Sequence, residues 1–311
     1  MHELLTAPAE IFAMFPSAWV ALIFVVGLLV GSFLNVVIHR VPIMLEREWK
    51  EQAQQILSGE PVPALATEPA PKKDRYNLVV PRSACPKCGV MITALQNIPL
   101  ISWLFLRGKC ANCANPISVR YPIVELITGI LSAAIAWKFG VHWYTAAALF
   151  FTWMLIGMSG IDFDTTLLPD NMTLPLLWVG LLISIAGTDA TIGLPVDMRS
   201  SIIGAVAGYL SLWSVYHLFK LLTGKEGMGY GDFKLLGALG AWLGWQSLPL
   251  IILLSAFVGA VVGITLIVVR GRDRNIPIPF GPYLAAAGWI AMMWGDALIG
   301  SYLRMSGISQ S

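Results

Sequence analysis

Charged residues are scarce in this sequence. Asp, Glu, Lys and Arg make up 12% of its 311 residues, whereas a soluble domain usually contains roughly 25%. Hydrophobic residues make up 57%, and several apolar runs reach the roughly 18–20 residues with which an α-helix crosses a bilayer. The composition therefore excludes an ordinary soluble enzyme and predicts an all-α polytopic membrane protein.

Two further absences narrow the possibilities. The chain has four histidines and no His-Glu-x-x-His pattern, which excludes a zinc metalloprotease of that type. Residues 1–17 contain no Lys or Arg, although a secretory signal peptide begins with basic residues. We therefore expect the first apolar segment, residues 18–38, to stay in the protein as a transmembrane helix.

Apolar runs separated by glycine, proline and polar residues predict about eight transmembrane helices. These helices lie near residues 18–38, 121–137, 143–161, 172–187, 200–221, 232–246, 248–269 and 279–296. The chain then divides into four parts. They are an N-terminal transmembrane helix (1–39), a long loop (40–120), a transmembrane core (121–300) and a C-terminal tail (301–311). The long loop contains an amphipathic helix, a linker and a cysteine subdomain at residues 84–116.

Basic residues are distributed unevenly between the loops. The long loop, residues 39–120, contains eleven Lys and Arg residues, and residues 220–234 and 270–274 contain three each. The loops on the other side contain three in all. Because basic loops tend to stay in the cytoplasm, we expect the long loop there and the N-terminus on the outer side.

The long loop has an organisation of its own. Leu45, Trp49, Ala53 and Ile56 recur at helical spacing between charged residues, which is typical of an amphipathic helix on a membrane surface. The next segment, residues 58–74, is rich in proline, alanine and charge and is expected to form a flexible linker.

All four cysteines follow this linker, in two Cys-x-x-Cys pairs. The pairs are Cys85 with Cys88 and Cys110 with Cys113. Two residues between thiolates let one turn present both sulfurs to a metal, and two such turns complete a tetrahedral site. A reducing cytoplasm disfavours the alternative of disulfides, and thioredoxin-type chemistry needs one pair rather than two. We expect a structural zinc site in a small zinc-ribbon-like insertion between the first two transmembrane helices.

The residue that follows each cysteine pair differs. Gly89 follows the first pair and suits the left-handed backbone that commonly ends such a turn. Ala114 follows the second pair and fits that conformation less well.

Acidic residues within or beside apolar segments need a reason, because charge is costly in a membrane. Asp162 lies at the end of the third predicted helix, and Asp232 lies at the start of the sixth. The predicted topology puts both at the cytoplasmic edge of the membrane, where their carboxylates can meet. Glu125, about one turn inside the second helix, also needs a partner, which the sequence does not identify.

Two facing carboxylates in a low-dielectric site share a proton, so that one acts as a base toward water and the other as an acid toward a carbonyl. Gly227, Gly229 and Gly231 precede Asp232 and leave room for an extended peptide beside it. This pattern favours aspartyl-protease chemistry. The alternatives are that the acids are simply interfacial, that they form the proton or cation path of a transporter, or that the chain is a scaffold whose zinc domain binds a partner.

Six motifs follow one another along the chain. They are GSFLNVVIHRVP (31–42), the two cysteine pairs, RYPIVELITG (120–129), IDFDTTLLPD (161–170), GMGYGDFKLLGALGAWLGW (227–245) and IPFGPYLAAAGW (278–289). In this order they resemble the bacterial type IV prepilin peptidase/N-methyltransferases, a group of GxGD-type intramembrane aspartyl proteases. The resemblance covers residues 20–300. It implies that Asp232 of the GxGD motif and Asp162, rather than Asp164, are catalytic, with Gly229 and Gly231 supporting the active-site loop.

The resemblance also implies two activities. Such enzymes cleave the basic leader from type IV prepilins and type II secretion pseudopilins, after a glycine, at the cytoplasmic face of the bacterial inner membrane. Members with the cysteine loop usually also methylate the new N-terminus, commonly Phe, with S-adenosylmethionine. The implied partners are these precursors and the lipid bilayer, without nucleic acid, and the N-terminus would be periplasmic. The cysteine loop has no Gly-rich nucleotide fingerprint, so the residues that bind S-adenosylmethionine stay unassigned, as does the oligomeric state.

Overall fold

The structure is a computed structural model, and it describes residues 12, 14–58, 75–185, 196–270 and 278–307. Within these ranges the chain is helical, with no β-strand beyond two isolated bridges. The expected linker at residues 58–74 lies, apart from Ser58, outside the described residues. The all-α class predicted from composition is confirmed for the described part of the chain.

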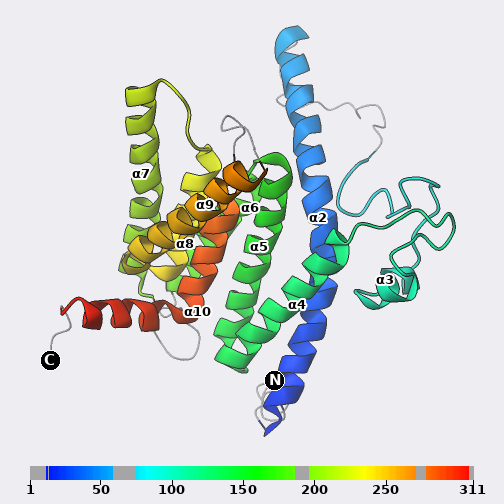
Figure 1. Ribbon diagram of the computed structural model, residues 1–311, viewed down its shortest axis with the longest axis horizontal. Helices are drawn as coiled ribbons and strands as arrows, with labels where there is room; N and C mark the ends of the chain where they lie inside the picture. Colours follow the sequence, from blue (N-terminus) through cyan, green and yellow to red (C-terminus); the bar gives the residue numbers. More distant parts are fainter. Residues whose placement is uncertain (1–11, 13, 59–74, 186–195, 271–277, 308–311) are drawn as a thin grey trace, which may run out of the picture. The chain divides into compact units, whose positions relative to one another are not determined.

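Each of the eight predicted transmembrane segments coincides with a helix (Figure 1). These helices are α2 (Pro16–Ser58), α4 (Arg120–Phe139), α5 (Trp143–Thr165), α6 (Asp170–Ile185), α7 (Met198–Thr223), α8 (Tyr230–Leu243), α9 (Leu248–Arg270) and α10 (Gly281–Met305). Six are long and apolar enough to cross a membrane, whereas α6 has 16 residues and α8 has 14. The protein is therefore a multi-pass membrane protein, but the expected count of about eight transmembrane helices is not exact.

The first helix differs most from the expectation. The amphipathic segment around Trp49 is helical, but it continues the first transmembrane segment, so that α2 is a single helix of 43 residues. Pro42 lies inside α2, although proline removes a backbone hydrogen bond and usually kinks or ends a helix. The transmembrane helix and the amphipathic helix that the sequence predicted as separate segments therefore form one continuous helix.

The chain forms two compact units. One comprises Phe24–Ile130, and the other comprises Met1–Ile23 together with Leu131–Ser311. The larger unit contains α5 to α10 and both aspartates of interest, and the smaller unit contains the cysteines. Each unit is described by itself below.

Helix α8 is the centre of the larger unit, where it packs against α6, α7 and α10 (Figure 1). Its residues from Leu235 to Leu243 are all buried. Helices α7 and α8 approach backbone to backbone, because a Cβ atom at Gly204 would collide with the carbonyl oxygen of Gly240. Close approach through small residues is a common way for helices to associate in membranes. The polar backbone of this short helix is thus enclosed by protein.

Helices α6 and α8 run parallel and begin at the same end of the unit. Asp170, the first residue of α6, forms an ion pair with Lys234, the fifth residue of α8, at 2.6 Å. Farther along both helices, the indole nitrogen of Trp242 donates a hydrogen bond to the carbonyl oxygen of Leu176, at 2.8 Å. These two ties fix the start of α8, which contains Asp232, against the start of α6.

Candidate functional site

Asp162 lies in the last turn of α5 and is buried, with 4% of its surface exposed. The helix ends because Thr166 adopts a left-handed conformation and donates its backbone N–H to the carbonyl of Asp162. The side-chain oxygen Oδ2 of Asp162 accepts a hydrogen bond from the backbone N–H of Gly281, at 3.0 Å. Gly281 is the first residue of α10, and the N-terminus of a helix favours a negative charge. The carboxylate of Asp162 is thereby both oriented and stabilised.

Asp232 lies in the first turn of α8 and is also buried, with 7% exposed. Its backbone N–H donates to the carbonyl of Gly229, at 3.2 Å. A Cβ atom built on Gly229 would lie 3.8 Å from Oδ2 of Asp232, so this glycine leaves the approach to the carboxylate open. The Gly229-Tyr230-Gly231-Asp232 motif thus forms the start of α8 itself.

Leu168, in the turn between α5 and α6, brings the two aspartates together. A Cβ atom at Gly231 would lie 2.6 Å from Cβ of Leu168, and one at Gly281 would lie 3.0 Å from Cδ1 of the same leucine. The neighbours of Asp232 and of Asp162 therefore pack against one side chain. The structure places the pair predicted from sequence in one buried site.

Two buried carboxylates that face each other have a simple chemical consequence. They do not both ionise easily, and one proton is then shared between them. Such a pair can take a proton from water and give one to a carbonyl oxygen. The site is therefore equipped for hydrolysis of an amide bond.

Two further acids close to Asp162 in the sequence lie outside this pair. Asp164 and Asp170 are exposed, and both carboxylate oxygens of Asp170 accept hydrogen bonds from Nζ of Lys234, at 2.6 and 2.7 Å. Lys234 thus links α8 to α6. It has a carboxylate partner other than Asp232.

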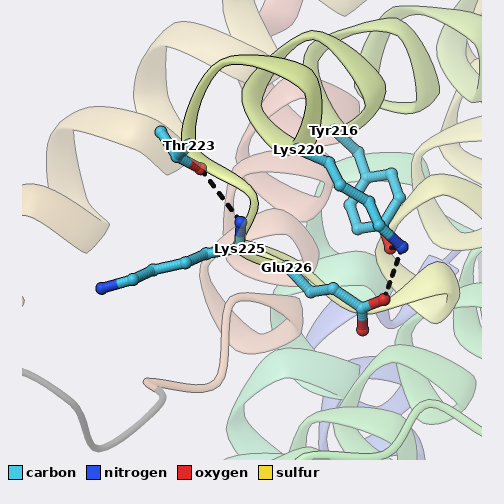
Figure 2. Close-up of polar contacts among 5 residues, drawn as sticks. All are labelled: Tyr216, Lys220, Thr223, Lys225 and Glu226. Carbon is cyan, nitrogen blue, oxygen red and sulfur yellow. Dashed lines mark hydrogen bonds and ion pairs between the residues drawn. The ribbon is translucent and has the colours of Figure 1, made fainter.

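The glycine-rich loop before α8 is tied to the end of α7 (Figure 2). Lys220 donates to the carboxylate of Glu226 at 2.8 Å and to the hydroxyl of Tyr216 at 3.5 Å. The hydrogen bond from Lys220 lowers the pKa of Glu226 below its usual value. At the base of the loop, the backbone N–H of Lys225 donates to the hydroxyl of Thr223, and the side chain of Lys225 points away from the ion pair (Figure 2).

In the smaller unit the four cysteines meet. The sulfurs of Cys85 and Cys113 are 3.7 Å apart, and those of Cys88 and Cys110 are 4.0 Å apart. All four sulfurs lie within 4.8 Å of one another. Four thiolates around a zinc ion, each at about 2.3 Å, would be about 3.8 Å apart. The donor set and its spacing therefore fit a tetrahedral metal ion.

The two cysteine pairs are built alike. In the first pair, the backbone N–H of Cys85 donates to the carbonyl of Val90, and the N–H of Gly89 donates to the carbonyl of Cys85. In the second pair, the N–H of Cys110 donates to the carbonyl of Asn115, and the N–H of Ala114 donates to the carbonyl of Cys110. Gly89 has φ +71°, and Ala114 adopts the same left-handed conformation with φ +55°. The poorer fit expected of Ala114 therefore does not prevent the turn. Backbone N–H groups directed at the sulfurs lower the pKa of Cys88 to about 6, and also lower the pKa of Cys110.

Glu125 acquires the partner that the sequence could not identify. Its Oε2 accepts a hydrogen bond from the backbone N–H of Leu100, at 2.9 Å. Gly31 of α2 packs on the backbone of Glu125, where a Cβ atom would lie 2.7 Å from its Cα. Glu125 thus fastens the cysteine-bearing loop to α4 inside the smaller unit.

Gly281 is the site residue to which sequence reasoning gave no role. It lies within the quoted motif 278–289, but its backbone N–H carries no side-chain signal. Pro282 directly after it is the available clue, because proline is favoured in the first turn of a helix. That clue predicts where α10 begins, but it does not predict that the start of α10 lies beside the carboxylate of Asp162.

Comparison with known families gives two matches. Residues 25–139 match the bacterial peptidase A24 N-terminal domain, and residues 149–264 match the type IV leader peptidase family. No solved structure gives a significant match to the chain.

Curated relatives match over almost the whole chain. A prepilin leader peptidase/N-methyltransferase of Aeromonas salmonicida is 55% identical over 93% of this chain and 95% of its own length. Proteins of the same name from Stutzerimonas stutzeri and Pseudomonas aeruginosa are 54% and 53% identical, each over 96% of this chain and over 99% and 98% of their own lengths.

Proposed function

The chain belongs to the type IV leader peptidase family, and on that premise we propose that it cleaves the leader of type IV prepilins with Asp162 and Asp232 as its catalytic pair. The enzyme is a membrane protease with N-methyltransferase activity. The observation that carries the residue assignment is that both carboxylates are buried and that the glycines beside them, Gly231 and Gly281, pack against the same side chain, Leu168. The transporter alternative has no such support.

The surroundings of the two aspartates suggest different roles. The N–H of Gly281 at the start of α10 stabilises a negative charge on Asp162. Asp162 then acts as the base that takes a proton from the attacking water. Asp232 holds the shared proton and donates it to the oxygen of the scissile carbonyl. In the second half of the reaction a carboxyl proton passes to the leaving amine.

The glycine-rich loop, residues 224–229, is the proposed position of the substrate backbone. Gly229 lies beside Asp232 without a side chain to block it, and Gly231 lets Leu168 pack closely beside the start of α8. A prepilin presents its cleavage site at the junction of a basic leader and an apolar helix. A site at the ends of α5 and α8 meets that junction if these ends face the cytoplasm, as the distribution of basic residues predicts. We propose pseudopilins as further substrates and the bacterial inner membrane as the location.

Methyl transfer is the second activity, and S-adenosylmethionine supplies the methyl group when it is bound. The acceptor is the α-amino group exposed by cleavage, which must be unprotonated to attack the methyl carbon. We propose that the cysteine subdomain supports this step, and that Cys85, Cys88, Cys110 and Cys113 hold a structural zinc ion. A zinc site whose four ligands all come from the protein stabilises a fold rather than activating a substrate.

Cys85→Ser and Cys113→Ser are each expected to abolish zinc binding, because removal of one thiolate opens the tetrahedral site. Metal analysis of the purified protein should give one zinc ion per chain in the wild type and essentially none in either variant. Methyl transfer should fall about 10- to 100-fold or more, as for loss of groups that support a metal site, while leader cleavage falls less. Thr93→Ala, in the same loop, should keep both zinc binding and methyl transfer. A wild-type protein without zinc and with four reactive thiols would overturn the assignment.

The proposed function is tested by purified protein in liposomes, supplied with a prepilin and S-adenosylmethionine. Mass spectrometry should show loss of the leader and, separately, the added mass of one methyl group on the mature N-terminus. Omission of S-adenosylmethionine should stop methylation without stopping cleavage. Absence of cleavage by reconstituted protein that still methylates a pre-cleaved pilin would contradict the proposal.

A further inference from the structure

A cluster of apolar side chains points outward from the cysteine-bearing loop. Helix α3 (Ile101–Phe105) and the 3-10 turn before it (Leu95–Asn97) expose large side chains, with Leu95 77%, Leu104 66% and Phe105 85% exposed. Ile98 and Ile101 are also exposed. We refer to these five residues, Leu95, Ile98, Ile101, Leu104 and Phe105, as the α3 patch.

The opposite side of α3 already has partners. The hydroxyl of Ser102 donates to the carbonyl of Gln96 at 2.5 Å, and the indole of Trp103 donates to Ile117 at 3.3 Å. Trp103 also packs against Gly108. The fold therefore uses the side of α3 that contains Ser102 and Trp103 for its own contacts and leaves the large apolar side chains of the patch outward, which is the reverse of a helix that faces water.

Two hydrogen-bonded ties hold this loop to α2 and α4, and a third hydrogen bond joins these two helices to each other. Leu100, inside the patch segment, donates its backbone N–H to Glu125 in the second turn of α4. Arg40 of α2 donates to the carbonyl oxygens of Asn77 and Pro81. Asn35 of α2 donates to the carbonyl of Tyr121, at the start of α4. Because α2 and α4 are both long and apolar enough to cross a membrane, these ties hold the loop where their crossing segments meet the membrane edge.

The charge of the same segment has one sign. Residues 75–120 contain six basic residues and no acidic residue. Arg82, Lys87, Arg107 and Lys109 are exposed, and the last two directly follow the patch in sequence. A zinc ion with four thiolates would bring two negative charges, which still leaves the segment positive. Exposed apolar residues flanked by basic ones are typical of an element that binds an anionic bilayer surface.

We propose that the α3 patch inserts into the interface of the bilayer, with Arg107 and Lys109 against the phosphate groups of anionic lipids. The cysteine subdomain is then a membrane-surface element rather than a freely suspended cytoplasmic loop. The apolar helix of a prepilin is the other occupant that could cover such a patch. The lipid is favoured because the ties to α2 and α4 place the patch at the membrane edge before any substrate arrives.

Photocrosslinking of the full-length protein tests this placement. Phe105→p-benzoylphenylalanine puts a photoreactive aromatic group at the most exposed position of the patch. Ala111, exposed in the second cysteine turn and outside the patch, receives the same substitution as the control. The probe is a vesicle of phosphatidylcholine with a minority of phosphatidylglycerol. After irradiation, intact-mass spectrometry should show lipid adducts at position 105 and few at position 111.

The lipid composition of the adducts tests the role of the charges. Phosphatidylglycerol should be enriched about fivefold over its share of the vesicle, since each basic residue near a membrane surface contributes about 1 kcal/mol. Arg107→Gln with Lys109→Gln should remove this enrichment and leave phosphatidylcholine adducts in place. Equal lipid labelling at positions 105 and 111 would overturn the proposal. So would replacement of the lipid adducts by prepilin adducts when substrate is added, which would assign the patch to the substrate.

Discussion

Asp162→Asn and Asp232→Asn are each expected to reduce leader cleavage by about 1,000-fold or more, because proton transfer to and from the reacting groups contributes about 10²- to 10⁴-fold. Asparagine keeps the size of the side chain and much of its hydrogen bonding, but it cannot exchange a proton at neutral pH. The acceptor of the Gly281 N–H can therefore be kept in Asp162→Asn. The measurement is the rate of leader release, followed by mass spectrometry.

Methylation separates loss of catalysis from loss of folding. A pre-cleaved pilin should still be methylated by both variants at close to the wild-type rate, because the proposed methyl transfer does not use the two aspartates. The matched control is Asp164→Asn, which removes an exposed carboxylate two residues from Asp162 and should leave cleavage within about twofold. Cleavage at the wild-type rate by either Asp162→Asn or Asp232→Asn would refute the assignment of the catalytic pair.

The sequence predicted the membrane helices and the acid pair for physical reasons that are local. Apolar runs are visible in composition, and an acid such as Asp232 at the start of one is conspicuous because a membrane helix normally excludes charge. The cysteine cluster was similarly accessible, since the spacing within each pair is a property of one turn. The structure brings Cys85 next to Cys113, as a metal site requires.

The features that the sequence did not predict depend on contacts between distant segments. Glu125 needed a partner, but nothing in its own helix identifies the backbone N–H of Leu100. Lys234 stands beside Asp232 in sequence, yet it pairs with Asp170, 64 residues away. The continuity of α2 through Pro42 is also decided by context rather than by intrinsic helix propensity.

Gly281→Ala is expected to lower the turnover number for leader cleavage about 100-fold, because a displacement of about 1 Å at a catalytic group can cost that much. A Cβ atom at this position would lie 2.7 Å from Oδ2 of Asp162, so the carboxylate must move away from the N–H that orients it. The KM for the prepilin should change little, since Asp162 acts on water rather than holding the leader. Initial rates over a range of prepilin concentrations separate the two constants.

The same helix supplies the control for that change. Gly300→Ala introduces an identical methyl group in α10 where nothing lies within 4 Å. Alanine favours a helix by about 1 kcal/mol over glycine, so cleavage should be unchanged.

A second variant identifies which contact of Gly281→Ala matters, because the new Cβ at position 281 would also lie 3.0 Å from Cδ1 of Leu168. If Leu168→Ala fully restored the activity of Gly281→Ala, crowding of the leucine would be the cause. Continued loss in the double variant, with methylation intact, would show that the start of α10 acts through Asp162.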